Sequence, residues 1–213
     1  MRALGRWLLW SLIGLLGSIG LLRAAAVRWW HVPDDDPWLE ASIAPSVRGG
    51  DWILLWRLTE PSLGALVICP EPRHADRKVI GRLVGKQGDR VRVEGTRVLV
   101  NDKPFGSEGE CAEPRFKVDP PQGGDQIELR CTLEAMHGVL HMRGNAEATA
   151  DVPVFEGELT SGQSMLVSDN RRYPYDSRDF GAVDRATCTE TVFFRVIGKE
   201  GFFDEATRFQ AIR

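Results

Sequence analysis

The hydrophobic and polar residues divide the chain into an apolar head and a mixed body. Residues 7–22 include no charged side chain, and Leu, Ile, Trp and Gly dominate this run. A run that is apolar on all faces and nearly long enough to cross a bilayer predicts a transmembrane helix over residues 7–26, with Arg23 reaching toward the headgroups. The same run also fits a cleavable signal peptide with Ala24, Ala25 and Ala26 as its cleavage site, and the segment alone leaves both interpretations open.

Beyond the head, short β-branched or aromatic runs alternate with Gly, Pro and Asp, a pattern that is typical of β-strands. The strands predicted in this way cover residues 52–58, 65–69, 78–84, 90–93, 97–100, 164–168 and 191–197, with weaker ones at 126–134, 138–143 and 148–155. Residues 94–96 are expected to form a hairpin turn. The pattern therefore predicts a mainly β fold, with one further helix candidate at residues 204–211.

These patterns predict an order of segments along the chain. Residues 1–6 form a short N-terminus, 7–26 the anchor and 27–40 a linker, because Pro33, Pro37 and three consecutive Asp residues oppose both helix and strand. Residues 41–101 and 161–200 form a β core, 102–160 a β-rich insertion and 201–213 a C-terminal tail. The core is expected to be built from antiparallel and mixed sheets.

Charge sharpens this division. The chain has 27 basic and 30 acidic residues, a formal net charge of −3, and no basic cluster, which argues against a nucleic-acid partner. Residues 1–33 hold four Arg and no Lys, Asp or Glu, so the remaining 180 residues carry 23 basic against 30 acidic side chains. All seven Trp lie between Trp7 and Trp56, as expected near a membrane interface. Arg2 and Arg6 favour an inside N-terminus.

The cysteine and histidine spacing indicates no metal site. There is no CxxC or HExxH motif, so we expect neither a metal nor another cofactor. Cys111 and Cys131 are the favoured disulfide pair if the body is exported, although four free thiols are an open alternative, and Cys69 is interpreted as a plain core residue. The histidines, including His141, are expected in solvated loops. The sequence does not indicate an oligomeric state.

Three polar segments stand out behind the head. The first runs from Ser42 through Pro45 to Gly50-Asp51, where Ser42 is expected in an extended or turn conformation with an exposed hydroxyl. The second covers residues 82–89 and is a strand that ends in a turn at Gly88-Asp89. The third packs charged side chains around a tight loop and consists of Ser168, Asp169, Asn170 and Arg171 followed by Asp176, Ser177 and Arg178. Each segment alone is common, but their order behind an apolar head is not.

Together these segments resemble the signal peptidase I family, the S26-type serine peptidases that include bacterial leader peptidase. The family's Ser-Met-x-Pro-Thr box corresponds to 42–46, and its Gly-Asp-Asn-Arg box ending in Asp-Ser-Arg corresponds to 168–171 and 176–178. The turn at 101–104 resembles the family's Asn-Gly-Lys-Pro. The resemblance implies a signal-peptidase-like β core behind an uncleaved anchor in the inner membrane. The N-terminus would lie on the cytoplasmic side of this membrane and the β domain on its outer, periplasmic face.

The resemblance also implies an activity and partners. It implies a membrane-anchored serine endopeptidase that removes signal peptides from exported preproteins, with the signal peptide and the lipid bilayer as partners and Ser42 as the nucleophile. A Lys base must be desolvated enough to lose its proton, and it must reach the Ser hydroxyl at hydrogen-bond distance. Arg82 is implied to pair with Asp169, and Asp176 with Arg178.

The sequence departs from the family at the base. With the family pattern aligned on Gly85 and Gly88-Asp89, Arg82 falls on the family's Arg and Gly81 on its Lys. Lys78 is the tentative substitute, but in a regular strand its side chain points to the face opposite that of residue 81 unless a β-bulge intervenes. Two accessory serines of the family fall on Pro174 and Glu40. A catalytically degenerate homologue that binds peptides or serves a membrane complex is therefore the alternative hypothesis.

Overall fold

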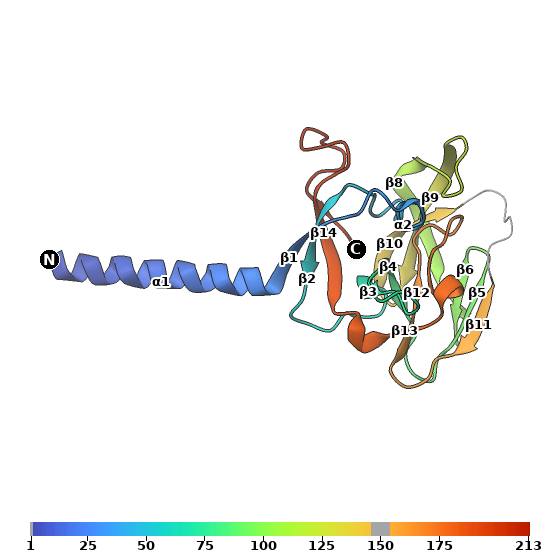
Figure 1. Ribbon diagram of the computed structural model, residues 1–213, viewed down its shortest axis with the longest axis horizontal. Coiled ribbons are helices and arrows are strands. Elements are labelled where there is room, and N and C mark those ends of the chain that lie inside the picture. The colour runs from blue at the N-terminus through green and yellow to red at the C-terminus, as the bar shows by residue number, and fades with distance from the viewer. Residues whose placement is uncertain (1, 146–153) are drawn as a thin grey trace.

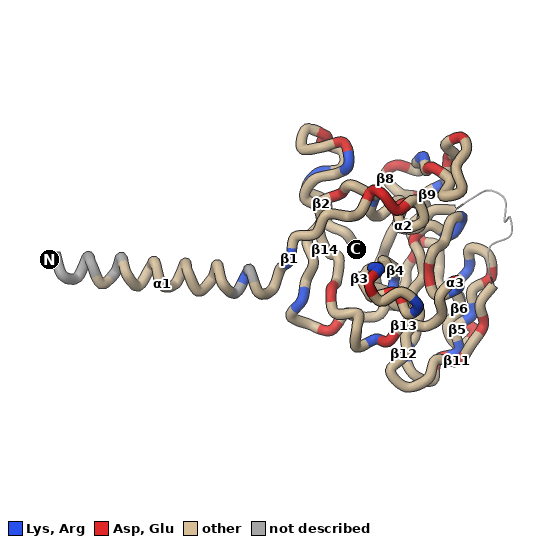
Figure 2. Tube along the Cα trace, viewed as in Figure 1, with Lys and Arg blue, Asp and Glu red and all other residues tan. Residues whose placement is uncertain are grey.

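A computed structural model describes residues 2–145 and 154–213 and shows one long helix projecting from a β-rich body (Figure 1). Helix α1 (Arg2–Ala26) points away from the body, and strand β1 (Val27–His31) follows it without a linker. The described charged residues lie almost entirely on the body (Figure 2). Within the described part of the chain, no helix is both long and apolar enough to span a membrane.

The largest sheet contains the strands that adjoin the three polar segments along the chain. Its strand order is β1-β2-β14-β3-β4-β12-β13, and β15 pairs with β14 at the side. The bounds of these strands are β2 Trp52–Trp56, β3 Leu66–Pro70, β4 Lys78–Val84, β12 Gln163–Val167, β13 Val183–Asp184, β14 Glu190–Ile197 and β15 Gln210–Ala211. The pairings are antiparallel, which confirms the predicted mainly β fold. Both faces of β4 are buried from its second residue onward.

Two smaller sheets complete the body. One has the order β11-β5-β6-β7 and the other β10-β9-β8. Their strands are β5 Arg90–Glu94, β6 Arg97–Val100, β7 Lys103–Pro104, β8 Gly106–Val118, β9 Ile127–Met136, β10 Val139–Asn145 and β11 Phe155–Glu158. The expected hairpin turn joins β5 to β6, and strands β7 to β10 lie within residues 103–145. The strand predicted at 148–155 lies outside the described residues except for 154 and 155.

The segment interpreted as a linker is instead structured. It contains β1 and the start of helix α2 (Pro37–Ile43). Asp36 caps α2 by accepting a hydrogen bond from the Leu39 amide at 3.1 Å, and Pro37 occupies the first turn, where a missing N–H costs nothing. The residues read as helix breakers therefore start a helix.

The helix predicted near the C-terminus is also absent. Residues 204–209 form turns, because the Asp204 side chain accepts hydrogen bonds from the Ala206 amide and the Thr207 hydroxyl. The short helices that do form are α3 (Ser177–Phe180) and the 3-10 helix η1 (Arg185–Thr187). Local side-chain hydrogen bonds win over a weak helical pattern here.

Two disulfides join segments of the body. Cys111 pairs with Cys131 inside the insertion, as predicted. Cys69 pairs with Cys188, so the interpretation of Cys69 as a plain core residue is wrong. Both cysteines of this second bridge are buried in an apolar cluster that also holds Leu166. Their pairing joins residues 119 positions apart, which is why strand patterns gave no sign of it.

Candidate functional site

Ser42 lies in helix α2, and its side chain is fully buried. Its hydroxyl donates a hydrogen bond of 2.9 Å to the Leu39 carbonyl, three residues earlier in the helix. The expectation of an exposed hydroxyl in an extended or turn segment is therefore wrong. The reason is the helix itself, which begins at Pro37 and places the Ser42 hydroxyl beside the carbonyl of the preceding turn.

The third polar segment is hydrogen-bonded directly to the Ser42 segment. The Asn170 amide donates to the Ser42 carbonyl at 3.0 Å, and the Asn170 side chain donates to the Ala41 carbonyl at 2.8 Å. The Asn170 side-chain oxygen also accepts hydrogen bonds from the amides of Arg172 and Tyr173. Asn170 thus holds the end of α2 and shapes its own loop, although the two segments are 129 positions apart.

Arg82 and Asp169 form the buried ion pair that the motif implied. Arg82 donates to the two carboxylate oxygens at 2.8 and 2.9 Å, and both side chains are fully buried. Burial is the largest single influence and raises the pKa of Asp169, but the charge and hydrogen bonds of Arg82, with smaller contributions from His141 and Ser46, together outweigh it, and the pKa is lowered. Arg82 also approaches the Ser46 hydroxyl at 3.4 Å. The pair therefore joins β4 to the first and third polar segments through charge and hydrogen bonds.

Asp176, Ser177 and Arg178 form a second scaffold. Asp176 caps α3 and receives hydrogen bonds from Arg178 at 2.9 and 2.7 Å, so this implied ion pair is present as well. Asp176 also accepts from the Ser168 amide at 2.8 Å, and the Ser177 hydroxyl accepts from the Leu166 amide at 2.8 Å. These residues hold the loop that follows β12.

Gly88 and Asp89 form the predicted turn. Gly88 has a φ of 83°, a conformation that favours glycine, and the Asp89 carboxylate accepts from the Lys86 amide at 2.9 Å. Asp89 also receives a hydrogen bond of 2.8 Å from the Asn101 side chain, which lies in the turn after β6. This hydrogen bond thus joins the turn before β5 to the turn after β6, both in the sheet β11-β5-β6-β7.

Gly81 fits closely against the neighbouring strand. A β-carbon at this position would lie 3.2 Å from Cβ of Leu166 and 3.3 Å from the carbonyl oxygen of Val167, both in β12. The side of β4 on which it would point is occupied by the apolar cluster that contains Val79, Leu83 and Leu166. The structure therefore gives Gly81 a packing role.

Lys78 and Ser42 are not in contact. The β3–β4 pairing runs without a register shift, so Lys78 lies on the face of β4 that also carries Ile80 and Arg82. This is the face on which Ile80 shares a cluster with Leu39 of α2. The exposed Lys78 side chain makes no hydrogen bond or ion pair with any described residue, whereas the Ser42 hydroxyl is occupied by Leu39.

A polar network that the sequence analysis missed lies at the N-terminus of α2. Arg77 binds Asp36 at 3.1 and 2.6 Å and donates to the Tyr175 hydroxyl at 2.7 Å. Tyr175 in turn donates to Glu71, which is almost completely buried, at 3.0 Å. Partial burial, followed by the hydrogen bond to Glu71, raises the pKa of Tyr175 to about 12. Tyr175 directly follows Pro174, one of the positions at which the sequence departs from the pattern that it resembles.

A second missed cluster joins the insertion to the third polar segment. Glu134 receives hydrogen bonds of 2.7 Å from both Arg143 and Arg171. His141 is buried 3.3 Å from Glu134 and 3.9 Å from Asp169, so the expectation that it lies in a solvated loop is wrong. The physical reason is that β10 packs its inner side against the Asp169 loop. No group of three potential metal ligands occurs among residues 2–145 and 154–213.

The close approach at Gly81 makes a testable prediction. We expect Gly81→Ala to lower the free energy of unfolding by about 1–3 kcal/mol, because β12 must shift to admit the methyl group. Chemical denaturation measures the difference. Gly106→Ala is the matched control, since a β-carbon there would meet only the Glu108 side chain, at an ordinary 3.6 Å. Equal stability of Gly81→Ala and the parent chain would contradict the packing role.

Comparisons with known proteins cover most of the chain. A family model described as signal peptidase, peptidase S26, matches residues 6–197. A crystal structure of a signal peptidase I from Enterococcus faecalis has 18% sequence identity and a TM-score of 0.36, with 62% of this chain and 97% of that chain covered. No curated protein matches the chain significantly. The family match includes all three polar segments.

Proposed function

Because the chain belongs to the signal peptidase S26 family, we propose that it recognises signal peptides of exported proteins at the outer face of a membrane without cleaving them through Ser42. The resemblance drawn from the three polar segments is confirmed by the family match, and the substrate class follows from the family. The observation that carries the second half of the proposal is the buried hydrogen bond from Ser42 to Leu39.

A serine is a nucleophile only when a base takes its proton. That base has to lie at about 2.6–3.2 Å from the hydroxyl or to reach it through one water. Here the Ser42 proton is directed to a backbone carbonyl, Gly81 has no side chain to offer, and Pro174 has no hydroxyl to orient a base. These three features support recognition without acyl transfer.

The backbone of β4 offers a place for an extended peptide. β12 pairs with β4 only over Arg82, Leu83 and Val84, whereas β3 pairs with β4 from residue 78 to residue 82. The described strands therefore leave the Lys78–Gly81 half of β4 with a strand partner on one side only. An extended peptide can add to such an edge through main-chain hydrogen bonds. This edge lies on the strand that packs beside α2. It begins directly after Arg77, which belongs to the polar network at the N-terminus of α2.

The proposed location rests on α1 and on the disulfides. In the proposal α1 is a single uncleaved anchor, with the N-terminus inside and the body outside the inner membrane. The helix leaves the body as a separate element and is almost free of charge in the part that Figure 2 colours. Two disulfides in the body support an oxidising compartment, because such bonds persist outside the cytosol.

An active endopeptidase with Lys78 as its base is the second candidate. One observation favours it: Lys78 lies on the sheet face against which α2 packs, and its ammonium has no other partner among the described side chains. A shift of the Lys78 side chain, together with loss of the Ser42–Leu39 hydrogen bond, would be needed to form the Ser–Lys contact. This candidate keeps the same substrates and the same membrane location.

Incubation of the full chain in detergent with a preprotein separates the two candidates. The proposal predicts that the preprotein remains intact and that its signal peptide can be cross-linked to the protein. Cleavage by the parent chain that Ser42→Ala abolishes would overturn the proposal in favour of the peptidase. In that case Lys78→Ala should also abolish cleavage, while Lys86→Ala, which removes an exposed lysine of a turn, should not. An intact preprotein without any cross-link would reject both candidates.

A further inference from the structure

Buried polar atoms that lack a hydrogen-bond partner gather at one place, between the insertion and the third polar segment. On the β9–β10 hairpin these atoms are both ring nitrogens of His141, the Nε atom of Arg143 and the side-chain oxygen of Asn145. The Nε atom of Arg171, which approaches from the loop after β12, also has no partner among the described residues. Buried polar groups are normally paired, so such a cluster indicates that something else is bound there.

The unpartnered nitrogens surround one carboxylate. Residues 141, 143 and 145 share one face of β10, and the strand register pairs His141 directly with Glu134. Arg143 and Arg171 each donate a hydrogen bond of 2.7 Å, through a terminal guanidinium nitrogen, to a different oxygen of Glu134. His141 Nε2 lies 3.3 Å from one of these oxygens. The two Nε–H groups therefore flank a single side chain, with the His141 ring beside them.

The charges at this place do not balance. Within the described part of the chain, Glu134 is the one carboxylate that forms an ion pair with Arg143 or Arg171, so one negative charge serves two positive charges. Burial lowers the pKa of Arg171, and the nearby charges of Arg178 and Arg143 act in the same direction. A buried charge without a counterion is costly, and a water molecule does not supply one. An additional anion does.

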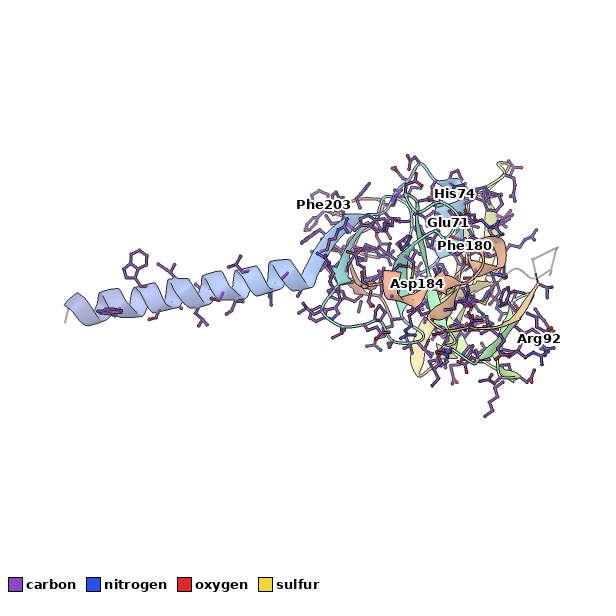
Figure 3. The ribbon with its side chains drawn as sticks, turned by 60° about the horizontal axis from the view of Figure 1, so that its bottom comes forward. Glu71, His74, Arg92, Phe180, Asp184 and Phe203 are labelled. Carbon is purple, nitrogen blue, oxygen red and sulfur yellow. A yellow bond between two sulfur atoms is a disulfide. The ribbon has the colours of Figure 1, made fainter. Side chains whose placement is uncertain are left out.

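The other arginines with an unpartnered buried nitrogen each have a carboxylate of their own. These pairs are Arg92–Glu94, Arg178–Asp176 and Arg195–Asp51. They lie apart from one another, and Figure 3 shows Arg92 at the end of the body away from α1. In each pair the charges cancel. Among the described residues, the Glu134 cluster is thus the place where unpartnered N–H groups coincide with an excess positive charge.

We propose that one small monovalent anion, such as chloride, binds between Arg143 and Arg171 and accepts hydrogen bonds from their Nε–H groups. His141 can add a third donor, because a neutral imidazole carries one N–H. The side chains of Arg171 and His141 are fully buried, which restricts the ligand to a small ion, whereas the Arg143 side chain is 13% exposed and gives access from the surface. This inference does not rest on the proposed function.

The anion ties the insertion to the loop that holds Ser42. Arg171 directly follows Asn170, whose side chain binds the end of α2. Gly144 in β10 forms backbone hydrogen bonds of 2.9 Å with both Asp169 and Arg171, so the strand and the loop are joined on either side of Asn170. The anion adds a contact between side chains at the same junction, and its removal therefore lowers the stability of the folded body.

Thermal unfolding of the full chain at constant ionic strength tests the inference. In detergent solution, sodium chloride or sodium bromide replaces sodium gluconate, whose anion is too large for this place, and unfolding is followed by tryptophan fluorescence. We expect Tm to rise by about 2–4 °C and then to level off, as for a ligand that binds only the folded state. An unchanged Tm, or a rise that never levels off, would overturn the site.

Arg143→Met is the diagnostic variant, because it removes one Nε–H donor and the excess positive charge. We expect this variant to lose the chloride-dependent rise in Tm, whatever its own stability. Arg130→Met is the matched control and should retain the rise, since Arg130 lies in the same hairpin but is 57% exposed and pairs with Glu110. Loss of the rise in both variants, or in neither, would contradict binding at Arg143.

Bromide also provides a measurement that does not depend on stability. If Arg143→Met does not fold, crystals of the parent chain grown with sodium bromide locate the ion through the anomalous signal of bromine. We expect an anomalous peak in contact with the Nε atoms of Arg143 and Arg171. A map with peaks at the protein surface and none at this place, that is, an adventitious ion only, would overturn the inference and leave the proposed function untouched.

Discussion

Glu134→Ala is expected to destabilise the body by about 3–5 kcal/mol, because it removes the carboxylate from a largely buried charge cluster. The Glu134 carboxylate accepts hydrogen bonds of 2.7 Å from Arg143 and Arg171, and Arg171 is fully buried. Without the carboxylate the Arg171 charge stays buried and unpaired. Denaturant unfolding of the body, followed by tryptophan fluorescence, measures the loss.

Glu128→Ala is the matched control on the same strand. Its carboxylate also pairs with an arginine at 2.7 Å, but the Glu128 side chain is 47% exposed, so we expect a loss of at most about 1 kcal/mol. Equal losses for Glu128→Ala and Glu134→Ala would contradict the assigned role of the buried cluster.

Acid should destabilise the protein through the same residue. Burial is the largest single influence and favours the neutral form of Glu134, but the charges of Arg171 and Arg143 and the contact with His141 together outweigh it, and the pKa is lowered from 4.5 to about 2. A lowered pKa stabilises the folded state above the unfolded value of 4.5, and this stability is lost as the pH falls toward 2. Because one pKa unit corresponds to about 1.4 kcal/mol, the loss is on the order of 3 kcal/mol, and Glu134→Gln should flatten the acid side of the stability profile.

The Cys69–Cys188 disulfide is expected to stabilise the body more than the Cys111–Cys131 disulfide. The first joins residues 119 positions apart and the second joins residues 20 apart. In the chain-entropy description these loops correspond to about 5 and about 3 kcal/mol. Replacing each pair by alanine and measuring the free energy of unfolding tests the ranking.

The two double variants act as controls for each other, because each removes two buried cysteines. A larger loss for the Cys111–Cys131 pair would contradict the expected order. No change in the unfolding of the parent chain on addition of a reductant would contradict the presence of both bridges in the folded protein.

Much of the sheet could be predicted from local pattern. The runs at 78–84 and 97–100 coincide with β4 and β6, because β-branched residues between Gly, Pro and Asp are a signal carried by neighbouring positions. The start of α2 was missed because Pro37 and the preceding aspartates oppose a helix interior. At the first turn and the cap the same residue types favour a helix, so composition alone predicted no helix where one begins.

The site depends on contacts that no local pattern contains. Ser42 is buried because Asn170 binds the end of α2 from 129 positions away, and His141 is buried because the insertion packs on the Asp169 loop. Motif order correctly indicated the Arg82–Asp169 and Asp176–Arg178 pairs. It gave no sign of the Arg77–Tyr175–Glu71 network, whose members stand outside the three segments.

The central claim is that the Ser42 hydroxyl is not activated, and its reactivity toward an acylating or phosphonylating serine reagent tests this most directly. The full chain is incubated with excess reagent, and the adduct is measured by intact mass and located by peptide mapping. We predict no adduct on Ser42 under conditions in which an active serine peptidase is fully modified. An adduct on Ser42 that disappears in Ser42→Ala, and forms more slowly in Lys78→Ala, would contradict the account.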